Sequence, residues 1–154
     1  MDNMARLEHK MTTKILLIDD DPAVTDLLGL LLKTLGYDVV SANSGARGVD
    51  LMHEKNPDLL ILDLMMPEMD GWQVCKAVRQ FSNVPIIILS ALNDPGVIAS
   101  ILDAGADDYL TKPTPSSVLA AHINKLVRRT TGTLTSEPEK KPNVLLSGTQ
   151  PFPS

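Results

Sequence analysis

The segment Lys14-Ile-Leu-Leu-Ile-Asp19 decides the fold class of this chain. A short aliphatic run between charged residues is typical of a strand buried on both faces of a parallel sheet. Similar runs recur at residues 37–42, 59–62, 85–89 and 108–111, and a stretch of helical period follows each of them. This alternation predicts an α/β fold: a doubly wound, five-stranded parallel sheet of (βα)5 order, with helices on both faces in three layers.

The helices are predicted from apolar residues at helical spacing and from start and stop signals. Pro22 suits a first helical turn, Gly36 supplies a stop, and Ser44 can cap the second helix. The five predicted helices span about residues 22–35, 44–55, 72–81, 93–105 and 115–129.

Composition indicates a single globular domain in a reducing compartment. The chain has 154 residues, 44% of them apolar, and a formal net charge of −5, which argues against a broad basic surface for nucleic acid. The single cysteine, Cys75, cannot form an intramolecular disulfide. No apolar run reaches transmembrane length, and residues 1–13 lack the apolar core of a secretion signal. We expect a cytoplasmic protein that binds neither membrane nor, through this domain, nucleic acid.

The two ends of the chain differ in composition from the rest. Residues 1–13 are predicted to be a flexible leader. Beyond residue 129 the sequence shifts to Thr, Ser, Pro, Glu and Lys without helical or strand period, so residues 130–154 are predicted to be a disordered tail or a truncated linker.

Polar residues follow the predicted strands at the edge where ligands bind in open parallel sheets. The first strand delivers Asp19 and Asp20, the third Asp63, the fourth Ser90 and the fifth Lys112. Converging carboxylates would repel one another unless a cation neutralised them, and oxygen ligands without His or thiolate favour Mg²⁺ or Mn²⁺. Taken singly, the first acids could instead serve only as helix N-terminal charges, and Asp63 only as a turn residue.

The joint placement of these residues indicates phosphoryl chemistry. A carboxylate such as Asp63 beside Mg²⁺ can attack a phosphoryl group and form an aspartyl phosphate, with Lys112 offsetting charge and Ser90 donating a hydrogen bond. Neither a GxxxxGK[ST] loop nor a GxGxxG fingerprint is present. The chain is therefore predicted to receive a phosphoryl group without selecting an organic substrate, which makes it a signalling module rather than an enzyme.

Five motifs resemble the receiver domains of two-component response regulators, in order and with suitable spacing over residues 14–129. They are Ile18-Asp-Asp-Asp-Pro22, Asp58-Leu-Leu-Ile-Leu-Asp63, Met66-Pro-Glu-Met-Asp-Gly71, Leu89-Ser-Ala91 and Gly105-Ala-Asp-Asp-Tyr-Leu-Thr-Lys-Pro113. The resemblance implies a CheY-like (flavodoxin-like) fold and phosphotransfer to Asp63 from a histidine kinase or a phosphotransfer protein. It also implies that Asp20, Asp63 and the backbone carbonyl of Met65 ligate Mg²⁺ directly, with Asp19 acting mainly through water.

The same resemblance assigns the remaining site residues. Lys112 would pair with the phosphoryl group, and the Lys112–Pro113 peptide is expected to be cis. Ser90 and Tyr109 would form a switch pair, in which the hydroxyl moves toward the phosphoryl group and the ring turns inward. Such a shift would bias a surface for a downstream protein or a homodimer, formed by the fourth helix, the fifth strand and the fifth helix.

The closest resemblance is to receivers of the OmpR/PhoB class, through Ala104-Gly-Ala-Asp-Asp-Tyr109. The chain departs from that class in having no winged-helix segment and in carrying Thr114 after Lys-Pro. Apolar residues or histidine also replace charges that pair across the class's dimer, at Val97, Ile98, Val118 and His122. An apolar contact on that face is the alternative to an ion-paired dimer.

Two further functions stay open beside a stand-alone signalling module. One is the receiver part of a transcription regulator whose DNA-binding domain is absent from this chain. The other is a phosphatase using an aspartyl phosphate, although Leu64 and Met65 leave no second acid after Asp63. Met65 and Leu92, two residues past Asp63 and Ser90, are apolar where receivers place side chains near the attacking water. This predicts slow autodephosphorylation.

Overall fold

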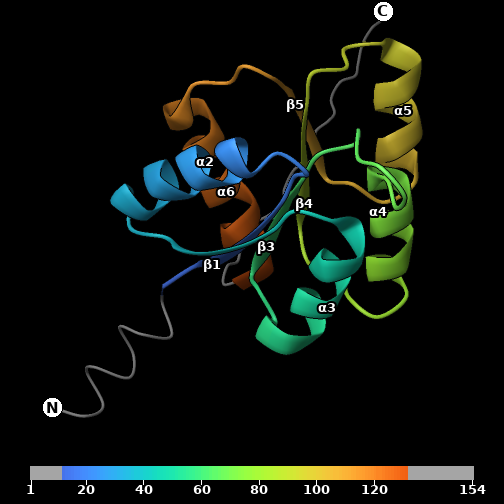
Figure 1. The fold of residues 1–154 in the computed structure, drawn as a ribbon. Coiled ribbons are helices and arrows are strands. Elements are labelled where there is room, and N and C mark those ends of the chain that lie inside the picture. The colour runs from blue at the N-terminus through green and yellow to red at the C-terminus, as the bar shows by residue number, and fades with distance from the viewer. Residues whose placement is uncertain (1–11, 132–154) are drawn as a thin grey trace, which may run out of the picture.

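The structure is a computed structural model that describes residues 12–131. Within that range five parallel strands form one sheet in the order β2-β1-β3-β4-β5 (Figure 1). Their bounds are β1 Lys14–Ile18, β2 Asp38–Ala42, β3 Leu59–Leu62, β4 Ile86–Ser90 and β5 Asp108–Thr111. The chain order reverses across β1, and the predicted parallel α/β sheet is confirmed.

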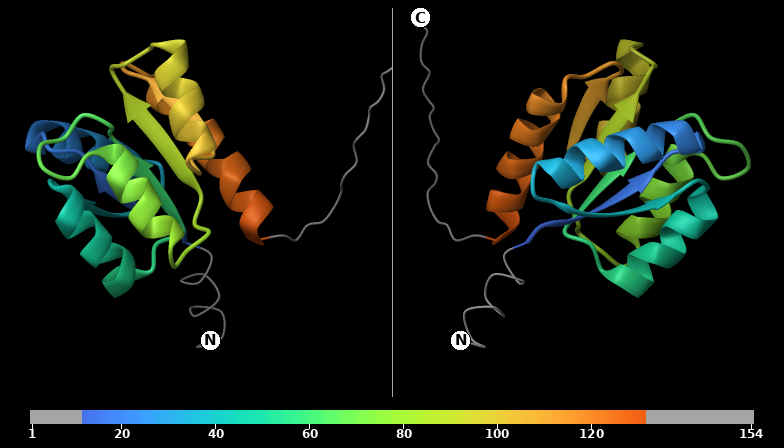
Figure 2. Two further views of the ribbon diagram at one scale, coloured as in Figure 1. Left: turned by 90° about the vertical axis from the view of Figure 1, so that its right-hand side faces the viewer. Right: turned by 60° about the vertical axis from the view of Figure 1, so that its left-hand side comes forward.

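Five helices cover the two faces of this sheet within the described residues. Their bounds are α2 Pro22–Thr34, α3 Gly45–Lys55, α4 Gly71–Arg79, α5 Pro95–Asp103 and α6 Ser116–Thr131. Helices α2 and α6 lie on one face and α3, α4 and α5 on the other, which gives the predicted three layers (Figure 2). None of the helices between residues 12 and 131 is long and apolar enough to span a bilayer.

The core has two halves, because alternate strand residues point to opposite faces. In β1, Leu16 and Ile18 pack under α3 and α4, whereas Ile15 and Leu17 pack under α2 and α6. All four side chains are almost fully buried. Burial of this kind on both faces explains why the strands are continuous aliphatic runs rather than alternating ones.

Helix boundaries differ from the predicted ones by a few residues where local hydrogen bonds decide them. Helix α4 starts at Gly71, not Trp72, because Asp70 and Gln73 form a capping box with bonds of 3.0 and 2.9 Å. Strand β4 starts one residue after Pro85, which has no N–H to donate to the ladder. Most of the predicted leader (residues 1–13) and of the predicted tail (residues 130–154) lies outside the described residues. Residues 130 and 131 are described, and they continue α6 instead of beginning the tail.

Candidate functional site

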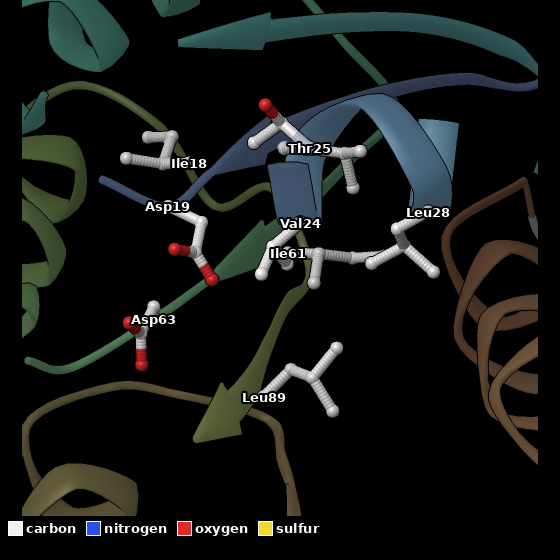
Figure 3. Close-up of a pocket in the computed structure, with 9 residues that line it drawn as sticks. Ile18, Asp19, Val24, Thr25, Leu28, Ile61, Asp63 and Leu89 are labelled. Carbon is white, nitrogen blue, oxygen red and sulfur yellow. The ribbon is translucent and has the colours of Figure 1, made fainter. Parts of the chain in front are cut away.

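The site lies at the carboxyl edge of the sheet, where β1 and β3 end side by side. Ile18 pairs with Leu62 in the parallel ladder, and the N–H of Asp63 donates to the Ile18 carbonyl at 2.9 Å. Asp19 and Asp63, the residues that follow these strands, therefore emerge next to each other. In Figure 3 both carboxylates point into the same space, beside the apolar side chains of Ile61 and Leu89.

Asp19, Asp20 and Asp63 form the predicted acidic cluster. Each offers a carboxylate oxygen, and the three oxygens lie within 4.8 Å of one another. Asp19 and Asp63 are each only 7% exposed, whereas Asp20 faces solvent. The neighbouring Asp21 does not join the cluster, because its side chain caps α2 by accepting from the N–H of Ala23 at 3.0 Å.

Lys112 supplies the positive charge of the site. Its Nζ lies 2.7 Å from Oδ2 of Asp19 and 3.8 Å from Oδ2 of Asp63. The residue follows β5, and its N–H donates to the Ser90 carbonyl at 2.9 Å, which fixes the start of the turn. The Lys112–Pro113 peptide is cis, as expected.

Burial raises the pKa of Asp63 above its usual range. Lys112 opposes the effect, the neighbouring charge of Asp19 adds to it, and the backbone N–H groups of Met65 and Leu64 stabilise the carboxylate and lower the pKa. Burial is the largest cause. A bound cation would offset this cost, because it would stabilise the ionised form of Asp63.

The donor set fits a small, hard divalent cation. It consists of carboxylate oxygens from two turns, with one acid open to solvent so that waters can complete the coordination. Of the residues predicted to ligate the metal, Asp19, Asp20 and Asp63 are brought together. Met65 lies two residues after Asp63 in the loop before α4, and its side chain points outward, 59% exposed.

Ser90 and Tyr109 are both connected to the backbone of Leu92. The Ser90 side chain is fully buried, and its Oγ accepts from the Leu92 N–H at 3.3 Å. The Tyr109 hydroxyl donates to the Leu92 carbonyl at 2.6 Å, while the ring packs against the core under α3, α4 and α5. One peptide segment therefore links the two residues of the predicted switch.

The face formed by α5, β5 and α6 combines apolar residues with an ion-pair cluster. Asp108 contacts Nδ1 of His122 and lies 3.9 Å from Nζ of Lys125 within the same chain. Leu102 on α5 and Val118 on α6 are exposed. The local sequence around His122 gives no sign of this partner, since the contact joins a strand residue to a helix residue 14 positions away.

Two other sets of contacts near the site were not predicted. Asn43 donates to the Asp19 carbonyl and to the Thr25 hydroxyl. The Trp72 indole donates to Oγ of Ser100 at 3.0 Å and so joins α4 to α5. Asn43 carries no signal by itself, because a single asparagine after a strand reads as a turn residue.

Comparison with known proteins identifies the class. Residues 15–124 match the family model described as the response regulator receiver domain, and the chain belongs to this family. It is 44% identical over 115 residues to the transcriptional regulatory protein AfsQ1 of Streptomyces coelicolor, covering 75% of this chain and 51% of AfsQ1. It is 42% identical over 120 residues to RpaA of Synechocystis, a DNA-binding dual master transcriptional regulator, covering 76% and 50%. The chain thus spans about half the length of the curated relatives it matches.

Solved structures give the same result. A two-component response regulator from Clostridium difficile matches with a TM-score of 0.75 at 30% identity, over 79% of this chain and all of that one. The BeF3-activated receiver domain of RstA from Klebsiella pneumoniae matches with a TM-score of 0.73 at 34% identity, over 75% and 99%. The predicted CheY-like fold, the receiver domain and the likeness to transcription-regulator receivers are confirmed.

Proposed function

We propose that this receiver accepts a phosphoryl group on Asp63 from a phosphohistidine of a histidine kinase or phosphotransfer protein. The observation that supports the proposal is the clustering of Asp19, Asp20 and Asp63 oxygens within 4.8 Å, with the Lys112 ammonium beside them. A Mg²⁺ ion, or Mn²⁺, held by these oxygens and by the Met65 carbonyl would offset charge on the phosphoryl oxygens.

In the proposed reaction a carboxylate oxygen of Asp63 attacks phosphorus, the new O–P bond forms as the N–P bond to histidine breaks, and the leaving imidazole takes up a proton. Lys112 is ion-paired with Asp19 before the reaction and would turn to the phosphoryl oxygens once they arrive. No organic substrate has to be selected, so the domain would act as a signalling module that assists its own phosphorylation and dephosphorylation.

The signal would leave the site through Ser90 and Tyr109. A Ser90 hydroxyl that turns toward a phosphoryl oxygen gives up its bond from the Leu92 N–H, and Tyr109 is held by the carbonyl of the same residue. Movement of this segment would change the α5–β5–α6 face, where exposed Leu102 and Val118 favour an apolar contact with a downstream protein or a second copy.

A second candidate is the receiver part of a cytoplasmic transcription regulator. It is favoured by the relatives, which are transcriptional regulators about twice as long as the matched region. In that case the altered face would control a DNA-binding domain in the same polypeptide. DNA binding by the full gene product, and its dependence on phosphorylation, would separate this function from that of a stand-alone module.

Intact mass spectrometry tests the central step. After incubation with acetyl phosphate and Mg²⁺ we expect one adduct of about 80 Da, the mass of a phosphoryl group, which is lost in Asp63→Ala and when EDTA replaces Mg²⁺. An adduct that persists in Asp63→Ala would contradict the assignment of the acceptor. Turnover of p-nitrophenyl phosphate beyond one equivalent would favour a phosphatase instead.

A further inference from the structure

We propose that Asn43 and Thr25 are positioning residues for the cation site: together they brace the turn that carries Asp19 and Asp20, although neither is a ligand. The inference rests on the proposed metal-dependent function of the acidic cluster. Hydrogen bonds with Ala42 and Asn43, at the end of β2, converge on the backbone of Asp19.

The brace holds the Asp19 backbone from two sides. The N–H of Asp19 donates to the Ala42 carbonyl at 3.2 Å, so the turn is tied to the end of β2. Asn43, the next residue after Ala42, donates through Nδ2 to the Asp19 carbonyl at 2.8 Å. Both peptide groups of Asp19 are thereby fixed to the same two-residue segment at the edge of the sheet.

Thr25 ties this arrangement to α2. Its Oγ1 accepts from Nδ2 of Asn43 at 3.0 Å and donates to the Pro22 carbonyl at 3.2 Å. The Thr25 side chain is buried, and Figure 3 shows its hydroxyl pointing away from the carboxylates of Asp19 and Asp63. Thr25 therefore acts on the turn through Asn43 and the helix, and not by contact with a bound ion.

Such a brace matters because the three carboxylates repel one another before a cation binds. A free turn would move Asp19 and Asp20 away from Asp63, and the cation would then have to bring them back at a cost in binding free energy. A turn held by hydrogen bonds to its backbone keeps the carboxylate oxygens of the three acids within 4.8 Å of one another. Preorganisation of this kind raises affinity without adding a ligand.

The test is the affinity for Mg²⁺, measured by isothermal titration calorimetry on the full chain. We expect binding to Asn43→Ala and Thr25→Val to be about three- to tenfold weaker than to the unchanged protein, the size expected for losing one or two such hydrogen bonds. Thr25→Ser keeps the hydroxyl and is expected to bind nearly as well as the unchanged protein. Thr34→Val removes the same kind of bond, to the Leu31 carbonyl at the far end of α2, and is expected to have no effect.

Thermal unfolding in EDTA separates positioning from a general loss of stability. Thr34→Val and Thr25→Val both remove a hydroxyl from α2, so a general weakening of the helix would affect both variants alike. A lower Mg²⁺ affinity in Thr25→Val alone therefore indicates an effect on the acidic turn. With acetyl phosphate, the weakened variants are expected to need more Mg²⁺ for half-maximal phosphorylation while reaching the same maximal rate.

Equal Mg²⁺ affinity in all folded variants, or a Thr25→Ser protein as weak as Thr25→Val, would overturn the brace. An unchanged protein that binds no Mg²⁺ would contradict the proposed function itself, and the brace with it. The two failures are distinguishable, because only the second affects the protein without substitutions.

Discussion

At the scale of single residues, burial makes the negative charge of Asp63 unfavourable for folding when no cation is bound. Burial raises its pKa, so in the range between the ordinary carboxyl pKa of about 4 and the raised value the folded protein holds a proton that the unfolded chain has released. The contribution of Asp63 to stability is therefore largest at low pH and is lost as pH rises through the raised pKa.

Asp63→Asn removes this charge while keeping the shape of the side chain. In EDTA at pH 7 we expect the variant to unfold at a higher temperature than the unchanged protein, with the difference shrinking as pH falls toward about 4. Mg²⁺ is expected to raise the midpoint of the unchanged protein more than that of the variant. Asp50→Asn, which removes an exposed charge on α3, serves as the control and is expected to show neither effect.

Met65 and Leu92 should control how long the phosphoryl group remains on Asp63. The Met65 side chain is largely exposed and Leu92 is half-buried beside Ser90, and neither can orient a water by hydrogen bonding. We expect Met65→Asn combined with Leu92→Glu to shorten the phosphorylated half-life by about tenfold, since an oriented water attacks faster. Phosphate release followed after removal of the donor measures this, and an unchanged or longer half-life would refute it.

At the scale of elements, the approach of α4 to the acceptor strand depends on Gly71. A Cβ at this position would lie 2.7 Å from the Asp63 carbonyl oxygen and 2.7 Å from Cα of Leu64, and backbone cannot yield as a flexible side chain would. The Gly71 N–H also donates to the Leu64 carbonyl at 3.0 Å. The N-terminus of α4 is thus packed directly against the chain that carries Asp63.

Gly71→Ala is therefore expected to destabilise the fold by about 1–3 kcal/mol, the usual cost of overpacking. Gly29 in α2 is the matched control, because its nearest contacts to an added Cβ are side-chain atoms at 3.8 Å. There alanine is expected to stabilise by up to about 1 kcal/mol through helix propensity. Urea unfolding of both variants gives the comparison, and a Gly71→Ala protein as stable as Gly29→Ala would exclude the packing argument.

The sequence predicted those elements whose signals are local. Buried strands are visible as aliphatic runs, and the predicted meeting of Asp19, Asp20, Asp63 and Lys112 could be read from the sequence because parallel strands end at one edge. The capping box at Asp70 was missed, so the predicted start of α4 fell at Trp72, one residue late. The Asn43–Thr25 contact and the Trp72–Ser100 bond join residues 18 and 28 positions apart, and nothing in their local sequence indicates a partner.

At the scale of the whole molecule, exposed leucines form an apolar stripe along α2. Leu27 and Leu30 are 62% and 61% exposed, and Leu31 and Leu35 extend the same stripe along the helix. Contiguous exposed leucines mark an interaction surface more often than isolated ones do. Because α2 begins two residues after Asp20, a protein donor that reaches the acidic turn would also meet the helix that carries this stripe.

The stripe should therefore distinguish protein donors from small ones. We expect Leu27→Lys combined with Leu30→Lys to slow phosphotransfer from a phosphorylated kinase or phosphotransfer protein by about tenfold or more, since hot-spot side chains of an interface typically contribute that much. Phosphorylation by acetyl phosphate needs no such contact and is expected to be unchanged. Phe81→Lys, an exposed apolar residue after α4 at the opposite edge of the sheet, is the control. Equal slowing with both donors would indicate damage to the site, and no slowing with either would exclude α2 as the surface on which the donor docks.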